Sequence, residues 1–257
     1  MGERKQLKYN SIKECICEVR FEAPNDIDVS ELFIKQIQTQ SFKEKGFIEK
    51  RLPLRDAPLQ LLKTSPQMRF APLYKYENLD YTIGFGFSSL IIDKKNAYTA
   101  FDEFMTFIKE VFFTLKELKS ADFTLKIKNL TELRLRYVNI FDDTLFQATK
   151  LELKYNNDEF EKDQKFSLQI NKKIDPVQNI NISLLNNATI RNFDKNETRT
   201  GSVVDFDAVS SLKEFELSNF SDKKILDVLE KLHKNIENEF ISLLDENYAN
   251  SKLGGWV

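Results

Sequence analysis

Charged side chains that alternate with apolar ones along predicted strands are the residues of this sequence best suited to chemistry. They occur in three segments, and the candidate ligand-binding residues are Glu14, Glu18, Arg20, Arg134, Arg136, Asp205 and Asp207. Because side chains two positions apart in a strand point to the same face, each segment would present its charges together. Paired carboxylates can hold a hard divalent cation, and arginines can bind phosphate through two parallel hydrogen bonds. If these strands share a sheet, the pattern predicts a pocket for a nucleotide or polyphosphate, or the site of a metal-dependent phosphoester enzyme.

The same pattern is also typical of a sheet face in water. Opposite charges on neighbouring strands contribute about 0.2 to 1 kcal/mol per pair, and solvated faces commonly carry them. In this second interpretation the charged side chains spread over an open face, and the protein works by binding a partner. The sequence leaves both interpretations open.

Other reactive residue types are scarce. His233 is the only histidine and lies beside Leu232 of a predicted helix, where a structural hydrogen bond competes with the role of a lone general base. Cys15 and Cys17 would share one face of a strand, a position that suits core packing rather than a disulfide or a nucleophile. We therefore assign no catalytic residue, no metal ligands and no cofactor.

Glycines are also few, with seven in the chain. Loops that bind phosphate through their backbone need glycine where the ligand approaches. The one close pair, Gly84 and Gly86, lacks a third glycine and lies between strand-forming residues. This pair therefore predicts a crowded or bent strand.

Hydrophobic periodicity predicts the elements that would position the charged residues. Alternation over 12–22 predicts a strand with Cys15, Cys17, Val19 and Phe21 on its buried face. Apolar residues at intervals of three and four predict helices over 101–118 and 225–243. Strands are expected within the segments 46–94, 123–141, 166–171, 178–190 and 201–209. A polar loop at 156–165 and a hairpin connection at 194–201 would separate the later strands.

This order of elements predicts an α+β fold with mostly antiparallel sheets and two long amphipathic helices. The chain 1–257 would form one domain, either undivided or built from two similar halves, 1–125 and 126–250, that share a core. Residues 251–257 would form a loose tail. Phenylalanine is the main aromatic residue, with 22 among 257 residues, which indicates an aromatic-rich core.

The charge balance and the ends of the chain bear on location and partners. A net charge of −2 provides no overall attraction for nucleic acid, although basic and apolar residues alternate at 123–128 and 133–137. The charged N-terminus lacks the apolar stretch of a secretory signal, and no apolar run is long enough to span a bilayer. We expect a cytoplasmic protein without membrane contact, whose partner is another protein or a second copy of itself, in a homo-oligomer.

Three segments together resemble a known family, namely Ile-Lys-Glu-Cys-Ile-Cys-Glu-Val-Arg-Phe at 12–21, Leu-Arg-Leu-Arg-Tyr-Val-Asn at 133–139 and His-Lys-Asn-Ile-Glu-Asn-Glu-Phe at 233–240. Their order and spacing are similar to those of a sporadically distributed family of prokaryotic proteins, of about this length and of unknown function. The resemblance covers nearly the whole chain, and it implies no activity and no catalytic residue. The patchy distribution of the family implies mobile genes and a link to phage defence.

The first strand is also similar, more loosely, to that of triphosphate-tunnel enzymes, which enclose a charged interior in an antiparallel barrel. Glu18-Val-Arg20 provides half of their Glu-x-Glu-x-Lys pattern, and Glu14 stands at a different spacing. We therefore carry two hypotheses. The first is an interaction or accessory protein, and the second is a phosphate-ligand binding protein or a metal-dependent phosphoester enzyme.

Overall fold

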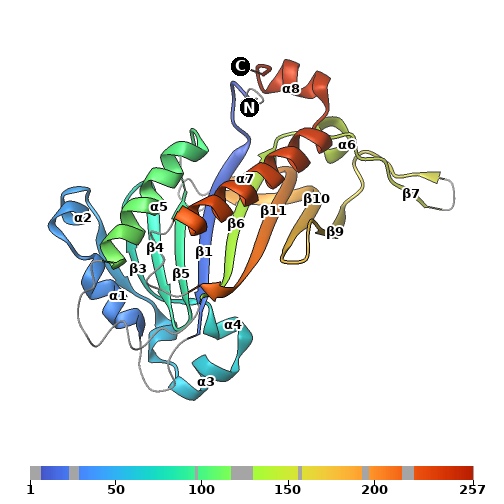
Figure 1. Cartoon of the computed structure of the whole chain (residues 1–257). Helices are drawn as coiled ribbons and strands as arrows, with labels where there is room; N and C mark the ends of the chain where they lie inside the picture. Colours follow the sequence, from blue (N-terminus) through green and yellow to red (C-terminus); the bar gives the residue numbers. More distant parts are fainter. Residues whose placement is uncertain are drawn as a thin grey trace. The chain divides into compact units, whose positions relative to one another are not determined.

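The fold is α+β, as the sequence predicts. The computed structural model describes residues 7–22, 29–95, 98–116, 130–155, 158–192, 197–215 and 223–256. Nine strands form an antiparallel sheet in the order β2-β3-β4-β5-β1-β6-β11-β10-β9 (Figure 1). The predicted long helices correspond to α5 and α7.

The elements have the following bounds. The strands are β1 (Ile12–Phe21), β2 (Ile48–Arg51), β3 (Pro72–Glu77), β4 (Tyr81–Gly86), β5 (Ser89–Lys94), β6 (Leu130–Phe141), β7 (Lys154–Tyr155), β8 (Asp158–Glu159), β9 (Phe166–Lys173), β10 (Gln178–Asn192) and β11 (Glu197–Phe215). The helices are α1 (Val29–Ile37), α2 (Gln40–Glu44), the short 3-10 helix η1 (Pro53–Asp56), α3 (Leu59–Thr64), α4 (Pro66–Arg69), α5 (Phe101–Lys116), α6 (Leu145–Ala148), α7 (Lys223–Leu243) and α8 (Glu246–Lys252). Within the described ranges, none of these helices is both long and apolar enough to cross a membrane.

Contacts divide the chain into two compact units, and each is described by itself. The β1–β6 unit comprises Glu14–Leu135 and Val209–His233. The β9–β11 unit comprises Met1–Lys13, Arg136–Ala208 and Lys234–Val257. The units interleave along the sequence, whereas the predicted halves would meet near residue 125.

A buried aromatic layer holds the helices of the β1–β6 unit against one face of its strands. Over the last seven residues of β1, every second side chain is buried, as the alternation predicts. The ring of Phe33 in α1 lies 5.8 Å from that of Phe21 and 5.7 Å from that of Phe85, measured between centroids. In α5, Phe107 stacks on Tyr81 of β4 at 3.9 Å. We call the opposite face of these strands, which carries the charged residues of β1 and β6, the open face.

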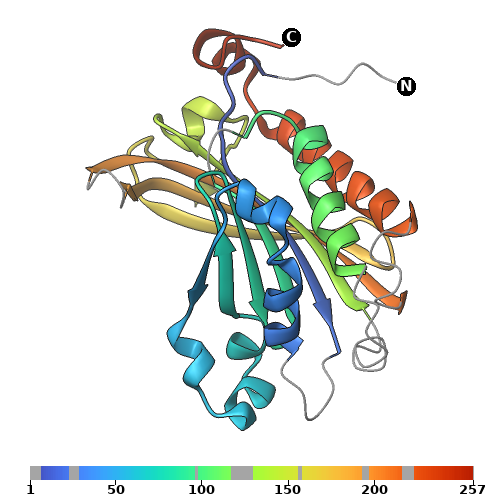
Figure 2. The same cartoon turned by 90° about the vertical axis from the view of Figure 1, so that its left-hand side faces the viewer.

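The two long helices confirm the predicted periodicity. Helix α5 covers the predicted segment up to Lys116, and residues 117 and 118 lie outside the described ranges. It runs beside the first part of α7 (Figures 1 and 2), where the rings of Phe101 and His233 stack with centroids 3.9 Å apart. His233 is half-buried there, at the boundary of the apolar stripe.

The predicted β-rich segment 46–94 contains β2 to β5, but its middle is helical. Pro53 and Pro66 are the first residues of η1 and α4, and Pro58 directly precedes α3. Proline suits the start of a helix because its fixed φ is helical and its missing N–H would have no partner there. These three prolines therefore mark the starts of short helices inside the segment expected to be β-rich.

Gly86 confirms the predicted crowding in β4. A Cβ atom at this position would lie 2.8 Å from the carbonyl oxygen of Ala71 and would also collide with Ser89 Oγ. At Gly84 the nearest atom is the Pro72 Cβ, at 3.2 Å. The backbone of the residues after α4, Phe70 and Ala71, therefore packs directly against Gly86 of β4.

The strands of the β9–β11 unit are longer than predicted. Strand β10 pairs with β9 in an antiparallel register, with Ile182 opposite Ile170 near its centre. The hairpin connection expected at 194–201 is wrong in its second half, because β11 already begins at Glu197; residues 193–196 lie outside the described ranges. The expected loop at 156–165 contains β8, which pairs with β7.

The C-terminal segment is held in place up to Trp256, in contrast to the loose tail expected from the sequence. Trp256 forms an antiparallel bridge with Leu7, and the N–H of Lys8 donates to the carbonyl oxygen of Gly255 at 3.1 Å. Gly254 and Gly255 have φ values of 75° and 77°, a conformation that glycine adopts without a steric penalty. These two residues turn the chain back toward its N-terminal segment.

Candidate functional site

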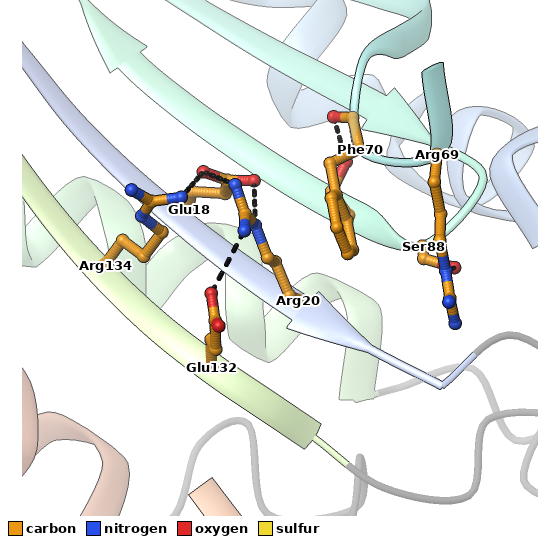
Figure 3. A network of polar contacts seen from close by, with 8 residues as sticks. Glu18, Arg20, Arg69, Phe70, Ser88, Glu132 and Arg134 are labelled. Atoms are coloured by element: carbon orange, nitrogen blue, oxygen red, sulfur yellow. Dashed lines mark hydrogen bonds and ion pairs between the residues drawn. The ribbon is translucent and has the colours of Figure 1, made fainter. Parts of the chain in front are cut away.

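A network of ion pairs lies on the open face of β1 and β6 (Figure 3). The guanidinium of Arg20 donates from Nε to Glu18 Oε1 at 2.7 Å and from Nη2 to Glu18 Oε2 at 3.3 Å. Its Nη1 donates to Glu132 Oε2 at 3.1 Å. Arg134 adds a second guanidinium, with Nη1 3.9 Å from Glu18 Oε2. All three side-chain nitrogens of Arg20 are thus engaged, and the bond from Nη1 to Glu132 links β1 to β6.

Strand alternation explains why these charges share one face. Their neighbours Val19, Leu133 and Leu135 are fully buried in the core, so the side chains between them point the other way. Glu18 and Arg20 are nevertheless only 16% and 19% exposed. Each of these partly buried charges is stabilised by its partner, because water could replace a lost partner only in part.

Two neighbouring serines hold an arginine and an aromatic ring at the edge of this network. The N–H of Ser88 donates to the carbonyl oxygen of Arg69 at 3.1 Å, and Arg69 Nε donates to Ser88 Oγ at 3.2 Å. Ser89 Oγ donates to the carbonyl oxygen of Phe70 at 2.7 Å. Both serines are fully buried. The end of α4 is therefore anchored to the connection between β4 and β5.

The ring of Phe70 brings two guanidinium groups together. The Cζ atom of Arg20 lies 4.1 Å from the ring centroid, and that of Arg69 lies 5.7 Å from it. Both distances fall within the range of attractive cation–π contacts. Figure 3 shows Phe70 between these two arginine side chains, which come from β1 and from α4.

The sequence around α4 explains its short length and its position. Ser65 is the N-cap, with its Oγ accepting from the Met68 N–H at 3.4 Å, and Pro66 occupies the first helical position. Pro72 begins β3 and cannot continue a helix, so α4 ends at Arg69. Arg69 and Phe70 belong to no periodic pattern, and the crowded Gly86 is the only signal in the sequence that a chain segment lies here.

Within the β1–β6 unit, the structure brings together some of the predicted ligand-binding residues. Glu18, Arg20 and Arg134 belong to one network, to which Glu132 also contributes. Glu14 lies on β1 with an exposed side chain.

Within the β9–β11 unit, Arg136 and Asp205 form a separate ion pair. Arg136 donates from Nε to Asp205 Oδ1 at 2.8 Å and from Nη2 to Asp205 Oδ2 at 2.6 Å. Asp207 is half-buried two positions further along β11. Both oxygens of Asp205 are therefore occupied by the guanidinium.

These pairings bear directly on metal binding. Glu18 and Asp205 each accept two hydrogen bonds from an arginine, at the oxygens that a hard cation would need. In the part of the chain that the structure describes, no group of three or more His, Cys, Asp or Glu residues could hold a metal ion. If these groups bind a ligand, the arginines would bind an anion through their guanidinium groups.

The two cysteines are core residues, as predicted. Neither Cys15 nor Cys17 forms a disulfide, and both are fully buried. Burial, with a smaller contribution from Glu18, strongly raises the pKa of the Cys17 thiol. Since the thiolate is the nucleophilic form, this residue is unsuited to nucleophilic catalysis.

Lys94 is a buried lysine that keeps its charge. Its Nζ donates to Glu103 Oε1 at 2.6 Å and to the Tyr81 hydroxyl at 3.1 Å. Burial by itself lowers the pKa of Lys94, but the bonds to Glu103 and Tyr81 outweigh it and raise the pKa. The ammonium group therefore holds the start of α5 to the sheet and is not a nucleophile.

Acid should weaken the fold through Glu77, which accepts from Lys50 Nζ at 2.5 Å and from Lys95 Nζ at 3.0 Å. Burial raises the pKa of Glu77, but the hydrogen bonds from both lysines outweigh it and lower the pKa from 4.5 to about 2. Because the unfolded chain then binds the proton more readily, this stabilisation is complete above pH 4.5 and is lost as the pH falls toward 2. In urea titrations, wild type should lose about 1 to 2 kcal/mol more than Glu77→Gln between about pH 5 and about pH 2.5.

The exposed Glu159 provides the control for this measurement. Its change to glutamine should alter the pH dependence less than Glu77→Gln does. The same pH dependence in wild type and Glu77→Gln would contradict the stabilising role of Glu77.

No protein-family model matches the chain, and a comparison with curated proteins finds no significant match.

Proposed function

We propose that this protein acts by binding another protein through the exposed surface of α3, as an interaction or accessory protein and not as an enzyme. The observation that carries the proposal is the exposure of two leucines in this short helix. Leu59 is 40% exposed and Leu61 is 47% exposed. Pro58, which precedes the helix, is exposed as well.

Helix α3 is apolar on more than one side. Leu59 and Leu61 lie about 200° apart around a helix axis, so the neighbours that bury Leu62 leave both of them partly in water. Of the three leucines in α3, only Leu62 is buried. Because Leu59 and Leu61 are a little less than half exposed, covering each of them would contribute about 1 kcal/mol. The simplest explanation for the exposure of these two leucines is a partner protein that covers them.

The charged open face supports binding over catalysis. Arg20 is fully engaged by Glu18 and Glu132, and these carboxylates hold a guanidinium in place of a substrate or a cation. Mutual pairing of this kind is typical of a network that stabilises a sheet.

The proposal covers two kinds of partner, a different protein and a second copy of this chain. The resemblance to a sporadically distributed prokaryotic family extends it to an accessory role in phage defence. Plaque counts on cells that express the wild type or an α3 variant would test this extension.

The experiment compares the wild type with the double variant Leu59→Ser/Leu61→Ser. Purified protein is used to capture partners from a cross-linked lysate, and its mass in solution is measured by light scattering. We expect a partner, or a second copy, to be retained by the wild type and lost by the double variant.

Leu79→Ser is the matched control, because this leucine is 86% exposed in the turn between β3 and β4. It should retain whatever the wild type retains. Retention of the same partner by the double variant would contradict the proposal. Hydrolysis of a nucleotide or of pyrophosphate by the wild type would favour the phosphoester enzyme instead.

A further inference from the structure

We infer that Arg69, supported by Arg20 and Phe70, forms a binding site for a phosphate group where α4 meets the connection between β4 and β5. This inference goes beyond the proposed partner surface and rests on different side chains. Leu59 and Leu61 have no part in it, so either proposal can fail without the other.

Arg69 differs from the arginines that are paired within the chain. Arg20, Arg136 and Arg199 each contact a carboxylate. For Arg69, no carboxylate oxygen of the described residues lies within 4.0 Å. Within those same residues, its side chain has one hydrogen bond, from Nε to Ser88 Oγ at 3.2 Å.

In the described part of the chain, neither terminal nitrogen of Arg69 has a hydrogen-bond partner, so both can donate to a ligand. A guanidinium presents its N–H groups as a planar fork that matches two oxygens of one phosphate. The side chain is half-buried, so part of it is in contact with solvent.

Arg69 is also held in position before a ligand arrives. Its backbone oxygen accepts from the Ser88 N–H at 3.1 Å, and its Nε is fixed by the hydroxyl of the same buried serine. The next residue, Phe70, is tied to Ser89 at 2.7 Å. A group that is already ordered loses less conformational entropy on binding, which favours affinity.

The local charge favours a doubly charged anion. Three arginines lie near Phe70 and β6, namely Arg20, Arg69 and Arg134; Arg20 contacts Glu18 and Glu132, and Arg134 contacts Glu18. Among the described residues no carboxylate pairs with Arg69, so its positive charge is the one that an anion would meet. Because the attraction grows with the charge of the ligand, a phosphate group should bind more strongly than a carboxylate.

Titration calorimetry on the full chain at low salt tests the site with inorganic phosphate, pyrophosphate and ATP. Acetate serves as the carboxylate control. We expect the phosphate ligands to bind more tightly than acetate, and Arg69→Gln to weaken them about tenfold or more. Tighter binding of ATP than of pyrophosphate would identify a nucleotide as the source of the phosphate, and equal binding would identify the phosphate group alone.

Arg199→Gln removes the same charge from an arginine that pairs with Asp142 in the β9–β11 unit, and it should leave the affinity unchanged. The absence of binding to the wild type would overturn the inference, as would equal binding to the wild type and to Arg69→Gln. Acetate binding as tight as phosphate binding would overturn the assignment to phosphate. If Arg69→Gln unfolds, the Nε–H resonances of the wild type decide, because pyrophosphate must shift that of Arg69 and not that of Arg199.

Discussion

Replacing Gly86 by alanine should lower the free energy of unfolding by about 3 kcal/mol, because the new methyl group has no space. Its Cβ would lie 2.8 Å from the carbonyl oxygen of Ala71, a backbone atom that cannot rotate away, and it would collide with Ser89 Oγ. Relief of the first clash requires the chain after α4 to move off β4, and relief of the second requires the Ser89 side chain to rotate. The rotation would also break the 2.7 Å hydrogen bond from Ser89 to Phe70. Urea denaturation measures the loss as a lower midpoint.

Gly84→Ala is the matched control in the same strand. There the Cβ would meet the Pro72 Cβ at 3.2 Å, a side-chain contact that a small shift can relieve. We expect a loss of about 1 kcal/mol or less. Neither Gly84 nor Gly86 has a positive φ, so the comparison measures space and not backbone strain. An equal loss at both positions would show that β4 is not crowded at Gly86 in particular.

The local part of the candidate site could be predicted from the sequence, because each strand determines the faces of its own residues. Val19 faces the core, so Glu18 and Arg20 must share the other face, and the structure has them there. The ion pair from Arg20 to Glu132 could not be predicted, because it joins residues 112 positions apart. Strand pairing at that distance depends on the whole fold, and no local pattern encodes it.

The position of Arg69 and Phe70 could not be predicted from the sequence either, for a related reason. Helix α4 has four residues, too few for an amphipathic period, and hydrogen bonds to Ser88 and Ser89 determine where it lies. Gly86 indicates that another part of the chain packs closely against β4, but the sequence does not show that this part is the segment after α4. At the C-terminus, residues 251–257 have the composition expected of a loose tail, but the freedom of φ at Gly254 and Gly255 allows the turn that they form.

Replacing Arg20 by alanine should lower the free energy of unfolding by about 2 to 3 kcal/mol. Glu18, which is 16% exposed, would lose both of its hydrogen bonds to the guanidinium, and Glu132 would lose its own. The cation–π contact with Phe70 would be lost as well, at a cost of about 0.5 to 1 kcal/mol. Arg20→Lys keeps the charge but cannot bind two oxygens in parallel, so it should recover only part of the loss.

The control is Arg136→Ala, which removes a bidentate pair whose carboxylate, Asp205, is 17% exposed like Glu18, but whose arginine is 45% exposed. Because water already reaches the arginine and only one carboxylate loses its partner, we expect a smaller loss of about 1 to 1.5 kcal/mol. A larger loss at Arg20 than at Arg136 would show that the network, with its third hydrogen bond and its less exposed arginine, contributes more stability than the single pair does. Equal losses would mean that the open face at Arg20 is as well hydrated as an ordinary surface. The same measurement bears on the phosphate site, because a hydrated Arg20 would add little to the field around Arg69.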